Sequence, residues 1–435
     1  TSYGFAVIPY NAVGTASDAV MTPVTSPTPY AYIGTTGVGL ADISFTFTNR
    51  AARSFYNVDI ARTVNGVYLD TTRFPKSITE YHDPTGAFYA DTSYQYTVTP
   101  YNAADVANAA TGQVTSVVSP VPTVNLSPVT IRTTDASFAF VGLATRPFWY
   151  VYVTRVAGGR IVDSTRMSLA TLSQRPGQIY VDPSGGAPVF TADSSYQYVV
   201  TPYNALDAPN VAGTVTTVPA SPFPVVSIGA IFVNTAELSF ALLNRTAYYT
   251  VSIARYIRGA LSAYTDQPLN TVIYDDLTPT PGATTKFVAD TSYVYYLRPY
   301  NAVGAAGNVL VTPAVSPAAV VAFGMFATTD VSFYLMRFSY QGVPGPDSYY
   351  YVSVSRYVNG RVLDTVAQPP GAVVYTDTSS TFFADTSYQY GLTPYNAVNA
   401  PNTASGATAR STVVSPPAVA VLSPLSISGD SLSVS

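Results

Sequence analysis

The sequence predicts an all-β protein, a tandem array of seven-stranded antiparallel β-sandwiches, and three observations lead to this fold class. One phrase, ADTSYQYTVTPYNA, recurs with small changes around Tyr94, Tyr196, Tyr293 and Tyr388, and a cut copy opens the chain at Thr1. The segments between the copies alternate apolar and polar residues without helical periodicity, which is typical of strands. Hydrophobic residues make up 47% of the 435 residues and charged residues only 10%, which indicates a folded chain and not a disordered one.

The spacing of the phrase sets the size of a repeat. Its aligned tyrosines lie 91, 102, 97 and 95 residues apart, which is one whole domain and far longer than the roughly 20–50 residues of a solenoid repeat. We therefore predict an elongated rod of end-to-end domains. Its segments are a partial repeat of late strands (1–27), four complete repeats (28–120, 121–222, 223–317 and 318–416) and a partial repeat of early strands (417–435). We expect the partial repeats to continue into a longer polypeptide, or to be completed head to tail by neighbouring chains.

Each complete repeat contains about seven strand-like segments. In 28–120 they are 43–47, 56–64, 67–71, 78–83, 87–91, 94–101 and 112–118. Asn65-Gly66 joins the second segment to the third, and this pair predicts a type I′ hairpin turn because both central residues need a positive φ. The turn glycine recurs as Gly66, Gly159, Gly259 and Gly360.

A Ser-Pro pair marks each predicted junction between repeats. The pairs are Ser26-Pro27, Ser119-Pro120, Ser221-Pro222, Ser316-Pro317 and Ser415-Pro416. Proline fixes φ and removes a backbone donor, so it ends a strand ladder and stiffens the chain that follows. Short linkers of this kind favour a semi-rigid array over freely hinged domains.

The repeated phrase resembles the E–F corner and F strand of fibronectin type III domains, which belong to the immunoglobulin-like sandwiches. Phe88 matches the apolar position before the corner, Tyr94 the corner tyrosine, and Asn102 the asparagine near the end of the strand. The resemblance implies that each corner tyrosine packs on the core while its hydroxyl bonds a nearby backbone group. These tyrosines are Tyr3, Tyr94, Tyr196, Tyr293 and Tyr388.

Two features depart from the family pattern. Where the family usually has tryptophan in strand B, the chain has Phe47, Phe140, Leu242 and Leu335. The phrase also carries a proline near its end, Pro100 in the first complete repeat, where a central strand would lose a ladder bond. We expect a bulge at this proline or an early end to strand pairing.

One arginine per repeat lies just before the hairpin turn, as Arg62, Arg155, Arg255 and Arg356. Strand parity puts Arg62 on the same face as Val58 and Ile60. We expect its stem to cover apolar surface at the rim of the sandwich, while its head meets an aromatic face or the aspartate of a recurring Tyr-x-Asp motif. The alternative is a repeated docking point for a neighbouring domain or subunit.

Two aspartate positions also recur, and they are favoured as turn residues that bond their own backbone. The first is Asp83, Asp182, Asp276 and Asp377; the second is Asp91, Asp193, Asp290 and Asp385. Calcium ligation and glycosidase-like acid pairs are weaker alternatives. His82 is the only histidine and cysteine is absent, so common zinc sites and Cys–His or Ser–His catalysis lack their parts. We expect no enzyme activity, no cofactor and no metal.

The favoured function is therefore structural. We predict a segment of an extracellular or virion-surface fibre or filament scaffold, which self-associates or contacts neighbouring structural subunits. The alternative is an adhesin or carbohydrate-binding repeat array at a cell or virus surface, whose partner is a glycan or receptor. A net charge of −4 without basic clusters argues against nucleic acid, and no apolar run is long enough for membrane insertion.

Overall fold

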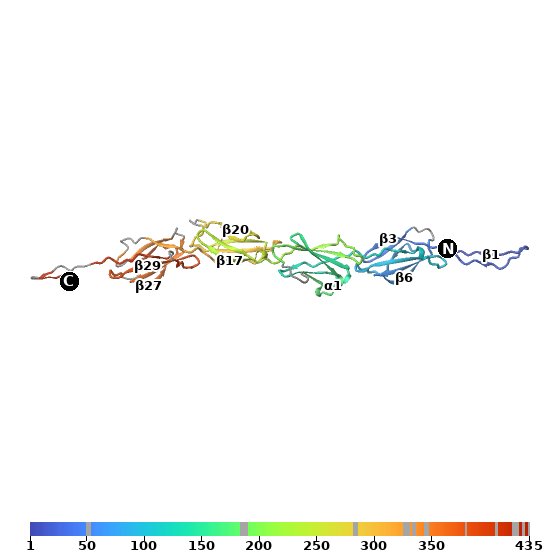
Figure 1. Ribbon diagram of the computed structural model, residues 1–435, viewed down its shortest axis with the longest axis horizontal. Coiled ribbons are helices and arrows are strands. Elements are labelled where there is room, and N and C mark those ends of the chain that lie inside the picture. The colour runs from blue at the N-terminus through green and yellow to red at the C-terminus, as the bar shows by residue number, and fades with distance from the viewer. Residues whose placement is uncertain are drawn as a thin grey trace. The chain divides into compact units, whose positions relative to one another are not determined.

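The structure is a computed structural model that describes most of the chain. The described residues are 1–48, 54–182, 190–281, 286–324, 331–332, 336–342, 348–378, 381–404, 408–419, 426–428 and 431–433. The contacts within the chain divide it into two compact units, and Figure 1 labels strands of both. One comprises Thr1–Phe190 and Ser194–Pro222, and the other comprises Thr191–Asp193 and Phe223–Ser435.

The first unit begins with a short hairpin and continues with two sandwiches. The hairpin pairs β1 (Ala6–Val7) with β2 (Val20–Met21). The first sandwich has a three-stranded sheet, β3 (Tyr32–Val38), β4 (Ile43–Thr48) and β7 (Glu80–His82). Its four-stranded sheet has the order β6 (Val67–Pro75), β5 (Asn57–Val64), β8 (Tyr94–Tyr101), β9 (Gln113–Val114), with the 3-10 turn η1 (Ala109–Thr111) before β9.

The second sandwich repeats this plan. Its three-stranded sheet is β10 (Thr130–Ile131), β11 (Ala136–Ala139) and β14 (Ile179–Asp182). Its four-stranded sheet is β13 (Arg160–Ser168), β12 (Tyr150–Ala157), β15 (Tyr196–Tyr203) and β16 (Val215–Thr216). The connections contain η2 (Leu143–Thr145), η3 (Pro176–Gln178) and one α-helix, α1 (Leu169–Ser173), whose first turn is capped by Ser168. We did not predict this helix, because five residues are too few to show a helical period.

The second unit contains the third and fourth sandwiches. In the third sandwich the three-stranded sheet is β17 (Ser227–Val233), β18 (Leu238–Leu243) and β21 (Ile273–Asp275), with η4 (Arg245–Ala247) after β18. Its four-stranded sheet is β20 (Ala260–Pro268), β19 (Thr250–Ile257), β22 (Tyr293–Tyr300) and β23 (Leu310–Val311). In the fourth sandwich the three-stranded sheet is β24 (Val321–Phe323), β25 (Met336–Gly342) and β28 (Val374–Asp377). Its four-stranded sheet is β27 (Arg361–Ala367), β26 (Tyr351–Val358), β29 (Tyr388–Tyr395) and β30 (Ala409–Arg410). The short hairpin β31 (Ser426–Ser428) and β32 (Ser431–Ser433) follows.

The predicted all-β fold class is confirmed, and every sandwich divides into three and four antiparallel strands. In 28–120 the prediction was wrong at two segments. Residues 87–91 are not a strand but the corner before β8, where Phe88 and Ala90 are buried. The first strand, β3, escaped prediction because its sequence, YIGTTGV, has two glycines and weak alternation.

The core of each sandwich lies between its two sheets. In the first sandwich Phe45 and Tyr81 come from the three-stranded sheet, while Val58 and Tyr96 come from the other sheet, and all four are at most 2% exposed. The pairing of Phe338 with Tyr375 corresponds to that of Phe45 with Tyr81. The buried residue that corresponds to Phe47 in the fourth sandwich is therefore Tyr340, and not Leu335 as we predicted; Leu335 lies outside the described residues.

The proline near the end of strand F causes no bulge. Pro100 pairs with Val58 in an unbroken β5–β8 register, while the pairing of β8 with β9 involves only Thr97 and Val98. The carbonyl of Pro100 accepts a bond from the Asn108 N–H, so the proline nitrogen points toward the side where the ladder with β9 has already ended. Of the two alternatives that we predicted, the bulge is wrong, whereas pairing does end early on the side of β9, so the missing N–H costs no ladder bond.

Candidate functional sites

The corner tyrosines bond backbone donors. The hydroxyls of Tyr94, Tyr293 and Tyr388 accept hydrogen bonds, at 3.0 to 3.2 Å, from the backbone N–H five residues earlier. Tyr94 also packs edge-on against Phe88, with ring centroids 5.1 Å apart, and burial raises its pKa. Tyr196 is 8% exposed, whereas Tyr3 in the first hairpin is 49% exposed. At Tyr94, Tyr293 and Tyr388 the hydroxyl thus satisfies a backbone donor at the corner.

The hairpin turn before β6 and its counterparts requires positive φ at both central residues. Gly66, Gly159, Gly259 and Gly360 have φ between 78° and 82°. The residues before them also have positive φ, including Arg258 at 50°. This pair of left-handed residues is the type I′ geometry that suits the right-handed twist of a two-stranded ribbon.

The recurring arginine binds the aspartate of the Tyr-x-Asp motif. In the first sandwich Arg62 contacts Asp83 at 2.6 Å, and the hydroxyl of Tyr96 donates to the other oxygen of Asp83 at 2.6 Å. Arg62 also forms a two-bond ion pair with Asp70 of β6, and the Thr85 hydroxyl and N–H donate to Asp83. In immunoglobulin-like nomenclature β5 is strand C, β6 strand C′, β7 strand E and β8 strand F, and the other sandwiches correspond. The Arg–Asp–Tyr cluster so defined joins strands C and F to the end of strand E, and so links both sheets.

The same Arg–Asp–Tyr cluster occurs in the other three sandwiches. The Arg–Asp distances are 3.2, 2.9 and 3.0 Å, and the Tyr–Asp distances are 2.8, 2.6 and 2.9 Å. The members are Arg155, Asp182 and Tyr198; Arg255, Asp276 and Tyr295; and Arg356, Asp377 and Tyr390. In each sandwich a register shift follows the arginine, for example between Arg62 and Thr63, and such a bulge re-aims the side chain beside it.

Burial shapes the electrostatics of the Arg–Asp–Tyr cluster. Desolvation and the adjacent aspartate raise the pKa of Tyr96, Tyr198, Tyr295 and Tyr390 far above the usual value, so these hydroxyls remain neutral donors. Burial also raises the pKa of Asp182. The described partners of the four arginines lie within their own sandwiches, so the docking of a neighbouring subunit on them stays a prediction.

The second aspartate position lies at the corner, and arginine binds it at Asp91 and Asp290. Asp91 accepts a bond from Arg146 at 2.7 Å, and Asp290 accepts one from Arg258 at 3.0 Å. His82 is exposed and contacts Asp42 at 3.0 Å, which raises the pKa of the imidazole. Among the described residues, no three acids or histidines come close enough together to hold a metal ion.

The junction between the first and second sandwiches is a network of hydrogen bonds that our sequence analysis missed. The side-chain amide of Asn204, in the turn after strand F of the second sandwich, donates to the carbonyls of Ser119 and Pro120 at 3.4 Å. The N–H of Ala205 donates to the carbonyl of Ala90 at the corner of the first sandwich, at 2.8 Å. Arg146 of the second sandwich binds Asp91 of the first.

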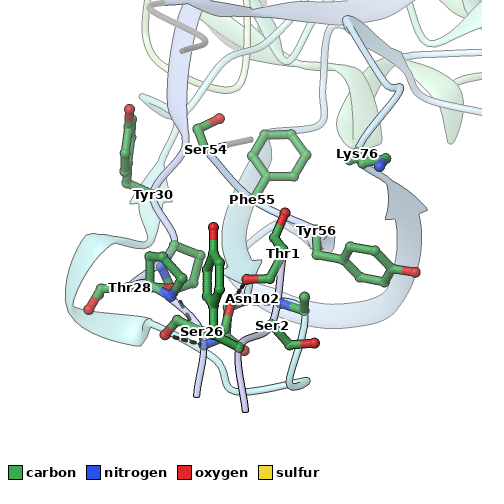
Figure 2. A pocket seen from close by; sticks show the side chains of 14 residues that line it. Thr1, Ser2, Ser26, Thr28, Tyr30, Ser54, Phe55, Tyr56, Lys76 and Asn102 are labelled. Atoms are coloured by element: carbon green, nitrogen blue, oxygen red, sulfur yellow. Dashed lines mark hydrogen bonds between the residues drawn. The ribbon is translucent and has the colours of Figure 1, made fainter. Parts of the chain in front are cut away.

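The third and fourth sandwiches are joined in the same way. Asn396 donates to the carbonyls of Ser316 and Pro317 at 3.2 and 3.1 Å, and the N–H of Ala397 donates to Ala289 at 2.8 Å. Before the first sandwich, Asn102 donates to the Ser26 and Pro27 carbonyls beside a hollow of about 510 Å³ (Figure 2). We call this arrangement the junction clasp: an asparagine that binds a Ser-Pro linker, together with an Ala–Ala backbone bond where a complete sandwich precedes.

The repeated phrase therefore has two ends with different neighbours. Its first alanine accepts a bond from the following sandwich, and its final Asn-Ala binds the linker and corner that precede it. The sequence held the signal, because PYNA and Ser-Pro recur in every repeat. The signal was missed because the two ends of one copy serve different junctions, and spacing along the chain does not show which distant segments meet.

The strand order defines the class of repeat. Each sandwich has one sheet of three strands and one of four, and in the larger sheet the edge strand C′ (β6 in the first sandwich) pairs with strand C (β5). This strand order makes the repeats tandem fibronectin type III-like sandwiches of the immunoglobulin-like group. No protein-family model and no curated protein matches the sequence. No helix in the described part of the chain combines the length and apolar character that a membrane crossing needs.

Solved structures resemble the chain at low identity. A two-domain fibronectin type III segment of chicken tenascin is 11% identical, with 45% of this chain and 97% of that chain covered and a TM-score of 0.30. A tetra-tandem repeat from the extending region of a large adhesion protein is 13% identical, with coverages of 90% and 99% and a TM-score of 0.40. A Ca²⁺-stabilised adhesin with which an Antarctic bacterium binds ice is 14% identical, with coverages of 89% and 99% and a TM-score of 0.17.

Proposed function

We propose that the chain is a non-enzymatic spacer, a segment of a fibre, filament or adhesin stalk at a cell or virion surface. The junction clasp carries this proposal. A chain of independent binding modules has no need to fix each linker, yet here asparagine side chains bind the carbonyls of Ser119-Pro120 and Ser316-Pro317. A linker held at its carbonyls loses bending freedom, and a stack of such joints keeps its two ends far apart.

The interior of the repeats supports the same function. The recurring polar residues that most resemble a catalytic set, such as Arg255, Asp276 and Tyr295, are buried and bonded to one another. They stabilise the sandwich and leave no exposed acid or base in that cluster for a substrate. The expected setting outside the cell rests on this spacer architecture.

Small-angle X-ray scattering of the full chain tests the spacer. With strands of eight or nine residues at roughly 3.3 Å per residue, four sandwiches in line reach on the order of 120 Å or more. The unaltered chain is expected to show one narrow distribution of lengths, and the combined variant N102A/N204A/N396A a broader and shorter one at unchanged secondary structure. Asn234→Ala, at a turn away from the junctions, is the control. Equal breadth in all three proteins would contradict the proposal.

A second function, an adhesin or carbohydrate-binding array, is favoured by one recurring feature. An exposed aromatic residue precedes strand C in every sandwich, and these residues are 42–49% exposed. They are Tyr56, Trp149, Tyr249 and Tyr350. Glycan-array binding that falls when all four are changed to serine supports this function, and binding that persists in the variant argues against it.

Self-association is the partner interaction that we propose for the spacer. The tip of each C–C′ hairpin presents apolar side chains, including Tyr68, Ile161, Leu261 and Val362, which are 57–74% exposed. They lie on edge strands, whose free backbone groups can pair with another chain. Sedimentation at rising concentration is expected to show dimers that disappear when these four residues become lysine, whereas a monomer at all concentrations would refute self-association.

A further inference from the structure

The tyrosine at the end of strand F has one ring face covered in three of the four sandwiches. The guanidinium of Arg73 lies 4.3 Å from the ring centre of Tyr101 in the first sandwich. In the second, the ring of Tyr150 stacks on Tyr203, with centroids 4.7 Å apart and an interplanar angle of 13°. In the fourth, Tyr351 stacks on Tyr395 at 4.5 Å and 8°.

Each covering side chain is anchored by the turn that follows strand F. Asp105 accepts a bond from Arg73 at 2.9 Å, and Asp207 accepts one from the Tyr150 hydroxyl at 2.7 Å. Asn399 accepts one from the Tyr351 hydroxyl at 2.5 Å. These three turn residues share a φ near +60°, so the anchor occupies the same backbone position in each turn.

The third sandwich lacks both the cover and its anchor. Thr250 pairs with Tyr300 in the register in which Tyr150 pairs with Tyr203, and Gly304 replaces the turn residue. Asp266 occupies the position of Arg73, so no guanidinium comes from strand C′ either. Among the described residues, no aromatic ring or cation stacks on Tyr300.

A hollow of about 450 Å³ lies where the cover would be. Its lining includes Tyr249, Tyr264, Asp266, Tyr300 and Asn301. This volume falls within the roughly 300–1,000 Å³ of small-molecule sites, and the combination of aromatic faces with a few polar groups is typical of them.

The polar groups in the hollow form an ordered chain. The Tyr264 hydroxyl donates to the Ser252 hydroxyl at 2.8 Å, and Ser252 donates to one oxygen of Asp266. The other oxygen of Asp266 faces no described donor, so it can accept a bond from a ligand hydroxyl. Arg298 lies opposite Ser252 on the same face of the sheet, where it would repel a cationic ligand.

We propose that this hollow binds a pyranose ring of a glycan. The apolar C–H face of the sugar takes the place of the missing ring on Tyr300, while its hydroxyls donate to Asp266 and to the oxygen of the Tyr264 hydroxyl. The inference goes beyond the spacer function, because it places one ligand site on one sandwich of the array. Scattering tests the spacer and glycoside binding tests the site. The chain can therefore prove to be a spacer without this site, or to carry the site without being a spacer.

Saturation-transfer NMR and calorimetry on the full chain test the site. The probes are methyl β-D-glucopyranoside, methyl β-D-galactopyranoside, methyl α-D-mannopyranoside and, as a cationic comparison, arginine ethyl ester. At least one glycoside is expected to bind at a single saturable site. The variant T250Y/G304D restores the cover and its anchor, and is expected to weaken binding about tenfold or more, as expected from losing a stacking contact. Thr71→Tyr, an added tyrosine on another sandwich, is the control that leaves binding unchanged.

A second variant keeps the test decisive if T250Y/G304D folds poorly. Y264F/D266A removes the hydroxyl and the acid that bond the sugar without adding a ring to the hollow, and is expected to weaken glycoside binding about tenfold or more. The absence of binding by every glycoside, or glycoside binding that T250Y/G304D leaves unchanged, would overturn the proposal. Binding of arginine ethyl ester in place of the glycosides would overturn it as well, because the hollow would then be a site for cationic side chains.

Discussion

The first and third sandwiches bury equivalent arginines, Arg62 and Arg255, in two different ways. Arg62 is 13% exposed along its side chain and binds two carboxylates, those of Asp70 and Asp83. Arg255 has 0% side-chain exposure and binds one carboxylate, Asp276. Its remaining bonds go to the Ser262 hydroxyl and to the carbonyls of residues 278 and 279.

This difference shows which part of the Arg–Asp–Tyr cluster is indispensable. The acid of the Tyr-x-Asp motif and the tyrosine of strand F are present in both sandwiches, whereas the acid of strand C′ is replaced by Ala263 opposite Arg255. In the third sandwich the Ser262 hydroxyl and the carbonyl of residue 279 accept from Nη2 of Arg255, whereas its buried Nε, whose counterpart in Arg62 binds Asp70, has no acceptor among the described residues. The third sandwich therefore depends on a single counter-charge for a more deeply buried cation.

The largest effect is expected from removing that single counter-charge. Asp276→Ala should destabilise the third sandwich by about 3–5 kcal/mol, because it leaves a buried cation unpaired. Asp83→Ala should cost the first sandwich less, about 2 kcal/mol, because Arg62 keeps Asp70. Hydrogen exchange by mass spectrometry measures opening in β19 and β5 separately within the full chain. Asp18→Ala in the exposed first hairpin is the control, and equal losses from D276A and D83A would break the comparison.

The tyrosine hydroxyl should come next in size. Tyr295→Phe removes one bond from a buried carboxylate, at an expected cost of about 1.5–3 kcal/mol. Tyr96→Phe should cost less, because the Thr85 hydroxyl also donates to Asp83, whereas the corresponding residue, Thr278, donates only its N–H to Asp276. Urea unfolding monitored by exchange in β22 and β8 distinguishes the two variants. A larger loss for Y96F would mean that Thr85 does not share the bonding.

The strand C′ acid should matter least. Asp70 has a side chain that is 42% exposed, so Asp70→Ala should cost the first sandwich only about 0.2–1 kcal/mol. Ala263→Asp adds the corresponding acid to the third sandwich, where Nε of Arg255 has no described acceptor, and should change its stability by no more than this, because desolvation of the added carboxylate offsets the new bond. Exchange rates in β5 and β19 again provide the readout. A gain above this range for A263D would show that the carbonyls satisfy Arg255 poorly.

Lowering the pH should destabilise the first sandwich more than the third. The hydrogen bonds from Arg62 and Arg73 lower the pKa of Asp70 and Asp59 below the usual value of about 3.9. This stabilisation is complete above that value and disappears as pH falls through the lowered pKa. Ala263 and Ser252 occupy the corresponding positions in the third sandwich and do not titrate. Between pH 5 and pH 2, exchange in β5 should accelerate more in the unaltered chain than in D59N/D70N, and an identical acceleration would contradict this assignment.

Sequence reasoning gave the fold because the repeats carry local signals. Asn65-Gly66 specifies its turn through positive φ, and strand parity places Arg62 beside the core. It missed β3 and α1, whose short or glycine-containing sequences lack a period. It also missed the junction clasp, since the partners of Asn204 lie 84 and 85 residues away in sequence.

The open face of Tyr300 could not be found from one repeat alone. The face is open because Thr250 and Gly304 replace the covering side chain and its anchor. This replacement becomes visible only when the four sandwiches are compared in space. For each recurring arginine the sequence left two alternative partners, an aromatic face or the aspartate of the Tyr-x-Asp motif. The role of the strand F tyrosine in the same cluster required the structure, because nothing in the sequence shows that this tyrosine meets the aspartate.

The central claim, that the junction clasp holds neighbouring sandwiches in one arrangement, is tested most directly by a distance measurement. The chain has no cysteine, so the pair T71C/S164C places the only two spin labels on the exposed edge strands of the first and second sandwiches. Pulsed electron paramagnetic resonance should give one narrow distance distribution, which Asn204→Ala broadens. A broad distribution in the chain that retains Asn204 would contradict the claim.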